Sequence, residues 1–136
     1  MKKIKKKISI HISHYVSKNS QKIYLKKIFK NFSKFDTDNY FFIHSNVNLK
    51  SKNLKKIKYI FHNLKNGDPR YLTWKSRKLM EKQKNNFDYF IYMEDDINFT
   101  KKNFQYWLKN SKDCIKNNFN LGFFRFEKDR KGLLWS

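Results

Sequence analysis

This chain of 136 residues contains no alanine, only three glycines, one proline and one cysteine. So few glycines exclude the glycine-rich loops that bind dinucleotides or nucleotide phosphates, and the chain has no G-x-S-x-G turn. The single cysteine, Cys114, cannot form an intramolecular disulfide and has no metal-ligating neighbours, which excludes a cysteine zinc site. No apolar run approaches the length of a membrane span.

Acidic residues are also scarce: the chain has 11 Asp and Glu but 32 Lys and Arg, which gives a formal net charge of +21. Only four of the basic residues are arginines. Arginine is preferred for base readout and for bidentate phosphate contacts, so we expect no specific nucleic-acid partner. The lysines are spread along the chain, which is typical of a solvated surface attracted to anionic lipid or to phosphorylated substrates.

The lysine-rich start, MKKIKKKISIHISHYVS, looks like the beginning of a signal peptide. Its apolar residues alternate with Ser and His, so it lacks the continuous apolar segment of a signal peptide. We therefore predict a cytoplasmic protein that can contact the inner face of an anionic membrane peripherally.

The first half of the chain predicts three strands and a helix. Residues 7–16, 39–45 and 56–62 are short β-branched or aromatic runs of the kind that form strands. Asn19 or Ser20 can cap a helix after the first strand. The apolar face of this helix has a period of about 3.6 residues and consists of Tyr24, Leu25, Ile28, Phe29, Phe32 and Phe35.

The second half continues the alternation of helices and strands. After the break at 67–69, the pattern predicts a helix over about 70–84, a strand over 87–93, a helix capped by Thr100 and a strand over 121–127. The run 87–93 is continuously apolar apart from Asp88, which is typical of a strand covered on both faces. The order predicts one α/β domain over residues 1–136, a Rossmann-like α/β/α sandwich with a mostly parallel sheet.

Three adjacent acids, Glu94, Asp95 and Asp96, follow the run 87–93 and form the densest acidic cluster in the chain. Ligands of open α/β sheets bind beyond the carboxyl ends of the strands. Side chains alternate along a strand, so we expect Glu94 and Asp96 to share a side and Asp95 to point away. Such oxygen ligands suit Mg²⁺ or Mn²⁺. The alternative is a polar turn; a calcium loop is excluded because the turn glycine and the twelfth-position Glu are absent.

Four segments in order resemble GT-A-fold glycosyltransferases with a DxD motif: DPRYLTWKSRKLM, FDYFIYMEDDINFT, a helix with FQYWL, and LGFFRFE. They match LTW-x-x-R, YxEDD, a helix ending in Trp, and GFxRxE, and cover roughly residues 68–127. The resemblance implies transfer of a sugar from a nucleotide-sugar donor to a glycan or lipid-linked acceptor, in the synthesis of surface glycans. Asp96 would coordinate the Mn²⁺ or Mg²⁺ that bridges the donor diphosphate, Glu94 would act through the metal's water or the donor ribose, and Asp95 would orient the loop or the sugar.

The chain departs from this pattern in two ways. Its first acid is Glu94 rather than an Asp, which changes the reach of the carboxylate by one methylene. It also ends soon after LGFFRFE, where GT-A domains usually continue. We therefore expect a donor-binding portion that is incomplete at the C-terminus. Whether this portion is active or is an inactive remnant stays open.

Four further residues are candidates for donor binding. Arg77 would reach the donor phosphates and Trp74 would shape the pocket, although Trp74 could instead pack under a neighbouring element. His14 and Tyr15 close the first predicted strand, where this fold class receives the nucleotide base; packing or surface positions are the alternative. Two other functions stay open: a non-catalytic basic protein that binds nucleic acid or anionic surfaces, and a metal-dependent phosphoryl-transfer enzyme.

Overall fold

The computed structural model describes residues 4–17, 23–64, 67–123, 127–128 and 134–135. It divides into two units, residues 1–99 and residues 100–136. The first unit contains a parallel sheet with two α-helices, and the second contains one α-helix and a short antiparallel pair of strands.

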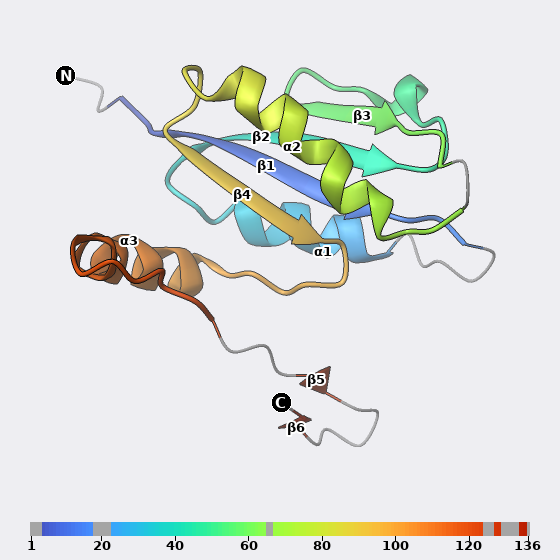
Figure 1. Ribbon diagram of the computed structural model, residues 1–136. Helices are drawn as coiled ribbons and strands as arrows, with labels where there is room; N and C mark the ends of the chain where they lie inside the picture. Colours follow the sequence, from blue (N-terminus) through green and yellow to red (C-terminus); the bar gives the residue numbers. More distant parts are fainter. Residues whose placement is uncertain (1–3, 18–22, 65–66, 124–126, 129–133, 136) are drawn as a thin grey trace. The chain divides into compact units, whose positions relative to one another are not determined.

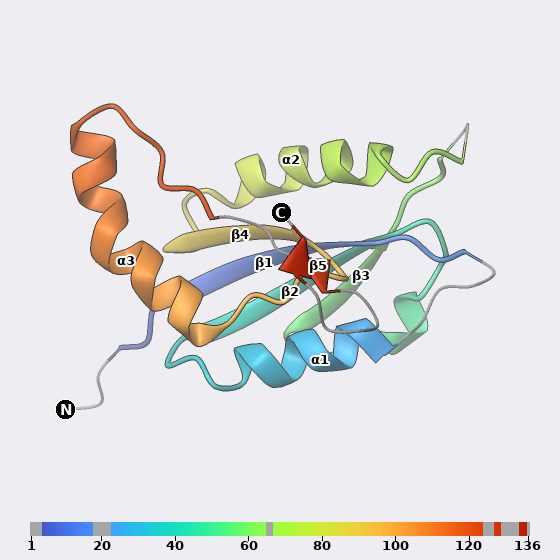
Figure 2. The same ribbon diagram turned by 90° about the horizontal axis from the view of Figure 1, so that it is seen from below.

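The first unit is built on a parallel sheet with the strand order β3-β2-β1-β4. Its strands are β1 (Lys7–His14), β2 (Asp38–Ser45), β3 (Ile57–Phe61) and β4 (Tyr89–Glu94). The helices α1 (Ile23–Phe32) and α2 (Tyr71–Gln83) lie on opposite faces of the sheet (Figures 1 and 2), and a short 3-10 helix, η1 (Lys50–Lys52), precedes β3. The predicted α/β sandwich with a parallel sheet is confirmed.

An aromatic core fills the α1 side of the sheet. Phe41 of β2 meets Phe29 and Phe32 of α1 edge to face, with ring centroids 4.9 and 5.7 Å apart. Phe35 packs on Phe32 at 4.6 Å, and both rings are buried. Edge-to-face pairs are favoured by the charge distribution of aromatic rings, so this cluster anchors α1 on the sheet. One residue of the predicted apolar face differs: Tyr24 is 39% exposed because it lies at the margin of the stripe, where its hydroxyl keeps access to water.

The α2 side of the sheet is polar. Successive residues of β1 point to opposite faces, so Ile8, Ile10 and Ile12 lie on one face and Ser9, His11 and Ser13 on the other. Both sets are buried. Gln83 of α2 accepts hydrogen bonds at its Oε1 from Ser9 Oγ at 2.8 Å and from His11 Nε2 at 3.0 Å, which places the polar set beneath α2.

Three histidines continue this polar layer across the sheet. His11 Nδ1 lies 2.9 Å from His44 Nε2, and His44 Nδ1 lies 2.8 Å from His62 Nε2. Because Gln83 Oε1 can only accept, His11 carries its proton on Nε2, and each following imidazole then donates from Nε2 to the Nδ1 of the previous ring. The chain is fully satisfied when all three rings are neutral. We call His11, His44 and His62 the histidine chain.

The strand β4 differs from its prediction. It lies at the edge of the sheet formed by the described residues, and four of its six residues are only half-buried. An apolar run shows which residues a strand contains but not where the strand lies in the sheet. It therefore cannot distinguish a central strand from an edge strand with large aromatic side chains. The strands covered on both faces are β1, whose sequence alternates, and the second half of β2.

The second unit begins with α3 (Lys101–Lys116). The predicted cap at Thr100 is confirmed: its hydroxyl accepts from the Asn103 backbone N–H, and the Asn103 side chain accepts from the Thr100 backbone N–H at 2.9 Å. The strand predicted over 121–127 is wrong for 121–123, which are not in a strand, and it is untested for 124–126, which lie outside the described residues. Glu127 belongs to the strand β5 (Glu127–Lys128), which pairs with β6 (Leu134–Trp135).

No helix among the residues described is long and apolar enough to cross a membrane. The predicted helix cap at Asn19 or Ser20 lies outside the described part of the chain.

Candidate functional site

The strand order creates a switch point between β1 and β4. From β1 the chain moves outward to β2 and β3, and it then returns to the other side of β1 as β4. The strand order reverses between β1 and β4, and ligands of open α/β sheets bind at such a point, outside the carboxyl ends of the strands. Ser13 at the end of β1 pairs with Glu94 at the end of β4, so both strands end at the same level.

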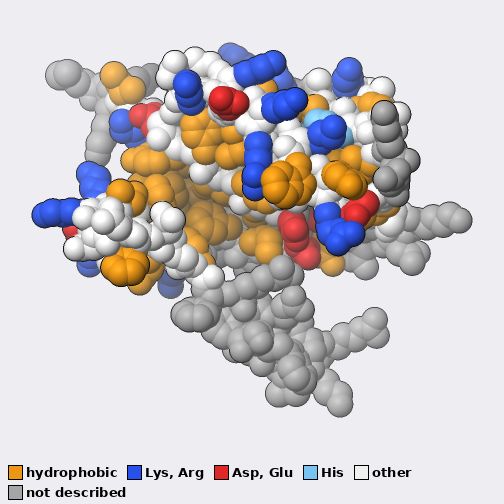
Figure 3. All heavy atoms as spheres, viewed as in Figure 1, with side chains coloured by type: hydrophobic (Ala, Val, Ile, Leu, Met, Phe, Trp, Pro, Cys, Tyr) orange, Lys and Arg blue, Asp and Glu red, His pale blue; other side chains and the backbone are white. Residues whose placement is uncertain are grey.

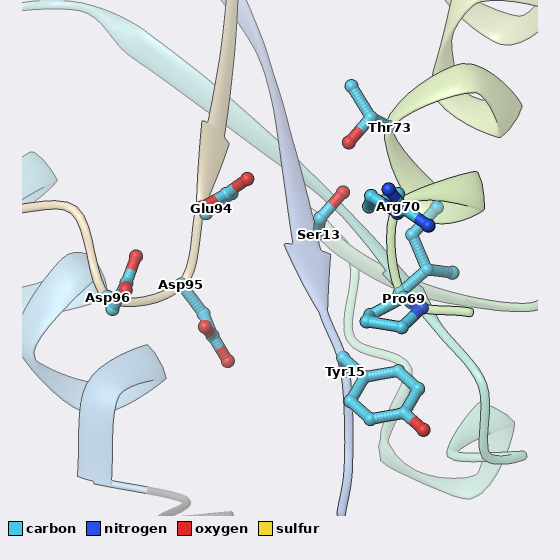
Figure 4. Close-up of a pocket in the computed structure, with 9 residues that line it drawn as sticks. Ser13, Tyr15, Pro69, Arg70, Thr73, Glu94, Asp95 and Asp96 are labelled. Carbon is cyan, nitrogen blue, oxygen red and sulfur yellow. The ribbon is translucent and has the colours of Figure 1, made fainter. Parts of the chain in front are cut away.

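A pocket of about 260 Å³ lies at this switch point (Figure 4). Its lining comes from three places: the end of β1, the start of α2 and the end of β4. The lining residues are Ser13, Tyr15, Pro69, Arg70, Leu72, Thr73, Glu94, Asp95 and Asp96. The structure therefore brings four of the predicted site residues together, Tyr15 and the three acids, at the predicted end of the sheet.

The three acids do not follow simple strand alternation. The strand β4 ends at Glu94, and Asp95 and Asp96 belong to the turn after it. The turn is held by backbone hydrogen bonds from Asp95 N to Ser13 O at 3.1 Å and from Ile97 N to Glu94 O at 3.2 Å. Figure 4 shows Glu94 extending toward Ser13, while Asp95 points in another direction. All three acids line the pocket, so the prediction that Asp95 points away from it is wrong. The reason is that side chains alternate only within a strand, and β4 ends at Glu94.

His14 fixes one of these acids. Its Nδ1 lies 2.6 Å from Asp95 Oδ2, and its side chain is only 3% exposed. His14 does not line the pocket, because it is buried behind the turn, whereas the next residue, Tyr15, does. The Tyr15 hydroxyl donates to the Gly67 carbonyl at 3.1 Å. Contact of either residue with a nucleotide base stays a prediction.

A second hydrogen-bond chain lies beside the pocket and was missed by the sequence reasoning. Ser13 Oγ lies 2.9 Å from the Tyr92 hydroxyl, which donates to Thr73 Oγ1 at 2.9 Å. It ties β1, β4 and the first turn of α2 together, and two of its members line the pocket. The only signal in the sequence was the polar residue before His14, and it is too common a feature to identify a site.

The start of α2 faces the pocket with its positive end. The first turn of a helix leaves backbone N–H groups unpaired and carries a partial positive charge, which favours anionic groups. Arg70 just before the helix forms a bidentate pair with Asp68, with Nη2 to Oδ2 at 2.7 Å. Hydrogen bonds from Arg70 lower the pKa of the Asp68 carboxyl below its ordinary value. The backbone N–H groups of Arg70, Tyr71 and Leu72 already donate to Asp68 and Pro69. The pocket is thus lined by acids on the β4 side and by Arg70 and the positive end of α2 on the other side.

Two predicted donor-binding residues lie elsewhere. Trp74 and Arg77 are on the outer surface of α2, where the Arg77 guanidinium lies 4.1 Å from the centre of the Trp74 ring. Trp74 is 60% exposed and does not line the pocket with the acids. Trp74 is not packed under a neighbouring element either. Instead, the Trp74 ring is in contact with the Arg77 guanidinium on this surface.

Two of the acids stay candidate ligands for a divalent cation. Within the described residues there is no group of three His, Cys, Asp or Glu side chains that could hold a metal by itself. Asp95 is engaged by His14, which leaves Glu94 and Asp96. Mg²⁺ commonly binds through one or two carboxylates and completes its shell with waters and substrate phosphates. Binding of Mg²⁺ or Mn²⁺ by Glu94 and Asp96 together with a phosphorylated ligand stays a prediction.

No family model, curated protein or solved structure matches the chain. The function of the site is therefore inferred from its geometry and from the sequence.

Proposed function

We propose that this chain binds the nucleotide-sugar donor of a metal-dependent glycosyltransferase reaction. The observation that carries the proposal is the pocket at the β1–β4 switch point, lined by three consecutive acids. Nucleotides bind at such switch points in α/β sheets. The resemblance of residues 68–127 to GT-A transferases supports the same assignment.

Each group at the pocket has a role in this proposal. Glu94 and Asp96 hold the divalent cation, and Asp95, held by His14, keeps the turn in place. When bound, the cation stabilises the diphosphate that leaves the anomeric carbon. The partial positive charge at the start of α2 favours the phosphates, and the hydrogen bonds that join Ser13, Tyr92 and Thr73 keep that turn in register with β1.

Thermal unfolding with and without ligand tests this proposal. UDP- and GDP-sugars are added with Mn²⁺, and the melting temperature is compared with that in Mn²⁺ alone. A ligand at about 100 times its dissociation constant adds about 2.7 kcal/mol of stability, which raises the melting temperature by several degrees. Asp96→Asn is expected to abolish the shift. Glu81→Gln, which removes a carboxylate from the exposed surface of α2, serves as the matched control and keeps it.

Three outcomes would count against the proposal. The first is the absence of a shift with every nucleotide sugar tried, and the second is a shift that survives Asp96→Asn. The third is metal-dependent cleavage of phosphodiesters, which would assign the same acids to phosphoryl transfer instead.

A further inference from the structure

The outward face of α2 carries a continuous row of aromatic and basic side chains, which we call the α2 stripe. Each member lies three or four residues from another member, and all are exposed: Tyr71, Trp74, Lys75, Lys78 and Lys82. The opposite side of the helix, with Leu72, Ser76 and Gln83, is buried. The stripe is therefore the surface that α2 leaves uncovered within its own unit.

The aromatic end of the stripe is unusual for a surface in water. Tyr71 is 50% exposed and Trp74 is 60% exposed. Together with Lys75 and Lys78 they line an open hollow of about 350 Å³. Tyrosine and tryptophan combine an apolar body with a polar end, and such side chains are favoured where an apolar phase meets water.

The stripe is also strongly cationic. Among the described residues, Lys75, Lys78 and Lys82 take part in no ion pair. The sequence of α2 holds four basic residues and a single acid, Glu81. Figure 3 shows Lys and Arg side chains beside apolar ones over this helix. A lysine can extend its apolar stem along a surface while its ammonium group contacts anionic groups.

We propose that the α2 stripe docks the protein on an anionic lipid surface. Trp74 and Tyr71 lie at the level of the headgroups, and the three lysines contact anionic headgroups. This assignment is independent of the glycosyltransferase proposal, because it needs neither the acidic pocket nor any reaction.

A single-stranded nucleic acid fits the stripe less well. Bases stack on open aromatic faces, whereas one face of the Trp74 ring is covered by the Arg77 guanidinium at 4.1 Å. The remaining cations of the stripe are lysines, which lack the planar fork that reads phosphates and bases.

The test is co-sedimentation of the full chain with phosphatidylcholine vesicles, with and without phosphatidylserine. One triple variant changes the stripe, Lys75→Gln, Lys78→Gln and Lys82→Gln. The matched control removes three exposed lysines from α1 on the opposite face of the sheet (Figure 2), Lys26→Gln, Lys27→Gln and Lys30→Gln. Each triple variant lowers the formal net charge of +21 by three, so the pair separates an oriented contact from general attraction.

We expect binding only to the vesicles that contain phosphatidylserine. The α2 variant should weaken it on the order of 100-fold, since each basic residue at an anionic surface contributes about 1 kcal/mol. The α1 variant should weaken it less than about threefold because its lysines stay distant from the surface and are screened. Trp74→Ala should also weaken binding, whereas Phe119→Ala, which removes another exposed ring, should not.

Three results would overturn the assignment. If both triple variants lost the same amount of vesicle binding, the binding would depend on net charge and not on the α2 stripe. If the protein bound equally well to neutral vesicles, the lysines would have no role in binding. A single-stranded RNA oligonucleotide is measured in parallel. If the α2 variant lost RNA binding selectively and kept vesicle binding, the stripe would be a nucleic-acid surface instead.

Discussion

Acidification is expected to destabilise this protein through two buried histidines. Burial lowers the pKa of His11 to about 4 and that of His44 to about 3, the latter helped by the neighbouring His11 and His62. Burial and the nearby Lys75 lower the pKa of His62 as well. In the unfolded chain these rings titrate near the ordinary value of 6.5. The unfolded state therefore takes up protons between pH 6.5 and the native values, and the native state does not.

The sign and size follow from this difference. Because both native pKa values lie below 6.5, the stability is complete above that pH and falls as the pH drops through 6.5 toward about 4 and 3. At pH 5, about 1.5 units below the unfolded pKa, each ring costs roughly 2 kcal/mol, so His11 and His44 together cost about 4 kcal/mol. This result hardly depends on the exact native values as long as both are below about 4.5. It is a large part of the roughly 5–15 kcal/mol that stabilises a typical domain.

The assay is urea unfolding followed by circular dichroism at about pH 7.5 and about pH 5. The imidazole NMR chemical shifts of His11 and His44 should stay those of neutral rings between these two pH values. The double variant His11→Gln and His44→Gln cannot titrate, although its amides can still donate to the neighbouring groups. We expect it to be less stable at pH 7.5 but to lose about 4 kcal/mol less on acidification. Paired carboxylates such as Asp38 and Asp88, whose pKa values lie below 3.8, lose their contribution mainly at lower pH.

Two results would refute this reasoning. One is a loss of less than about 1 kcal/mol in the wild-type protein between the two pH values. The other is the same loss in the double variant, which would assign the pH dependence to other groups.

Two further predictions concern single contacts. In a double-mutant cycle with His14→Gln and Asp95→Asn, we expect a coupling free energy of about 1 kcal/mol or more, because a short, largely buried contact of 2.6 Å joins the two side chains; additive losses in thermal unfolding would contradict this. Thr100→Ala should lower the free energy of unfolding of α3 by about 1 kcal/mol, measured by hydrogen exchange, because it removes the cap of the helix. Thr100→Ser keeps a hydroxyl at the cap and should lose much less, so equal losses would count against a capping role.

Local pattern was enough to predict the positions of most elements. The predicted strand over 39–45 is β2 (Asp38–Ser45), and the predicted helix over about 70–84 is α2 (Tyr71–Gln83). The cap at Thr100 was predicted from the residue type and is present. These features depend on residues close in sequence, whose side-chain periodicity and hydrogen bonding the sequence displays directly.

The burial of β1 could not be predicted in the same way. Its alternation of Ile with Ser and His is typical of a strand with one wet face. In the structure both faces are buried, because Gln83 of α2 and His44 of β2 satisfy His11. Those partners are 72 and 33 residues away, and no local pattern reports a partner at that distance.

The sequence by itself determined that three acids follow a strand near residue 94 in a chain with few acids. Tertiary structure alone decided that β4 returns beside β1, which brings the acids to a switch point with Ser13 and Thr73. It also decided that Trp74 and Arg77 lie on the outer surface of α2 and away from that pocket. Strand order and helix orientation are set by packing between distant segments, and that packing is not encoded in the spacing of neighbouring residues.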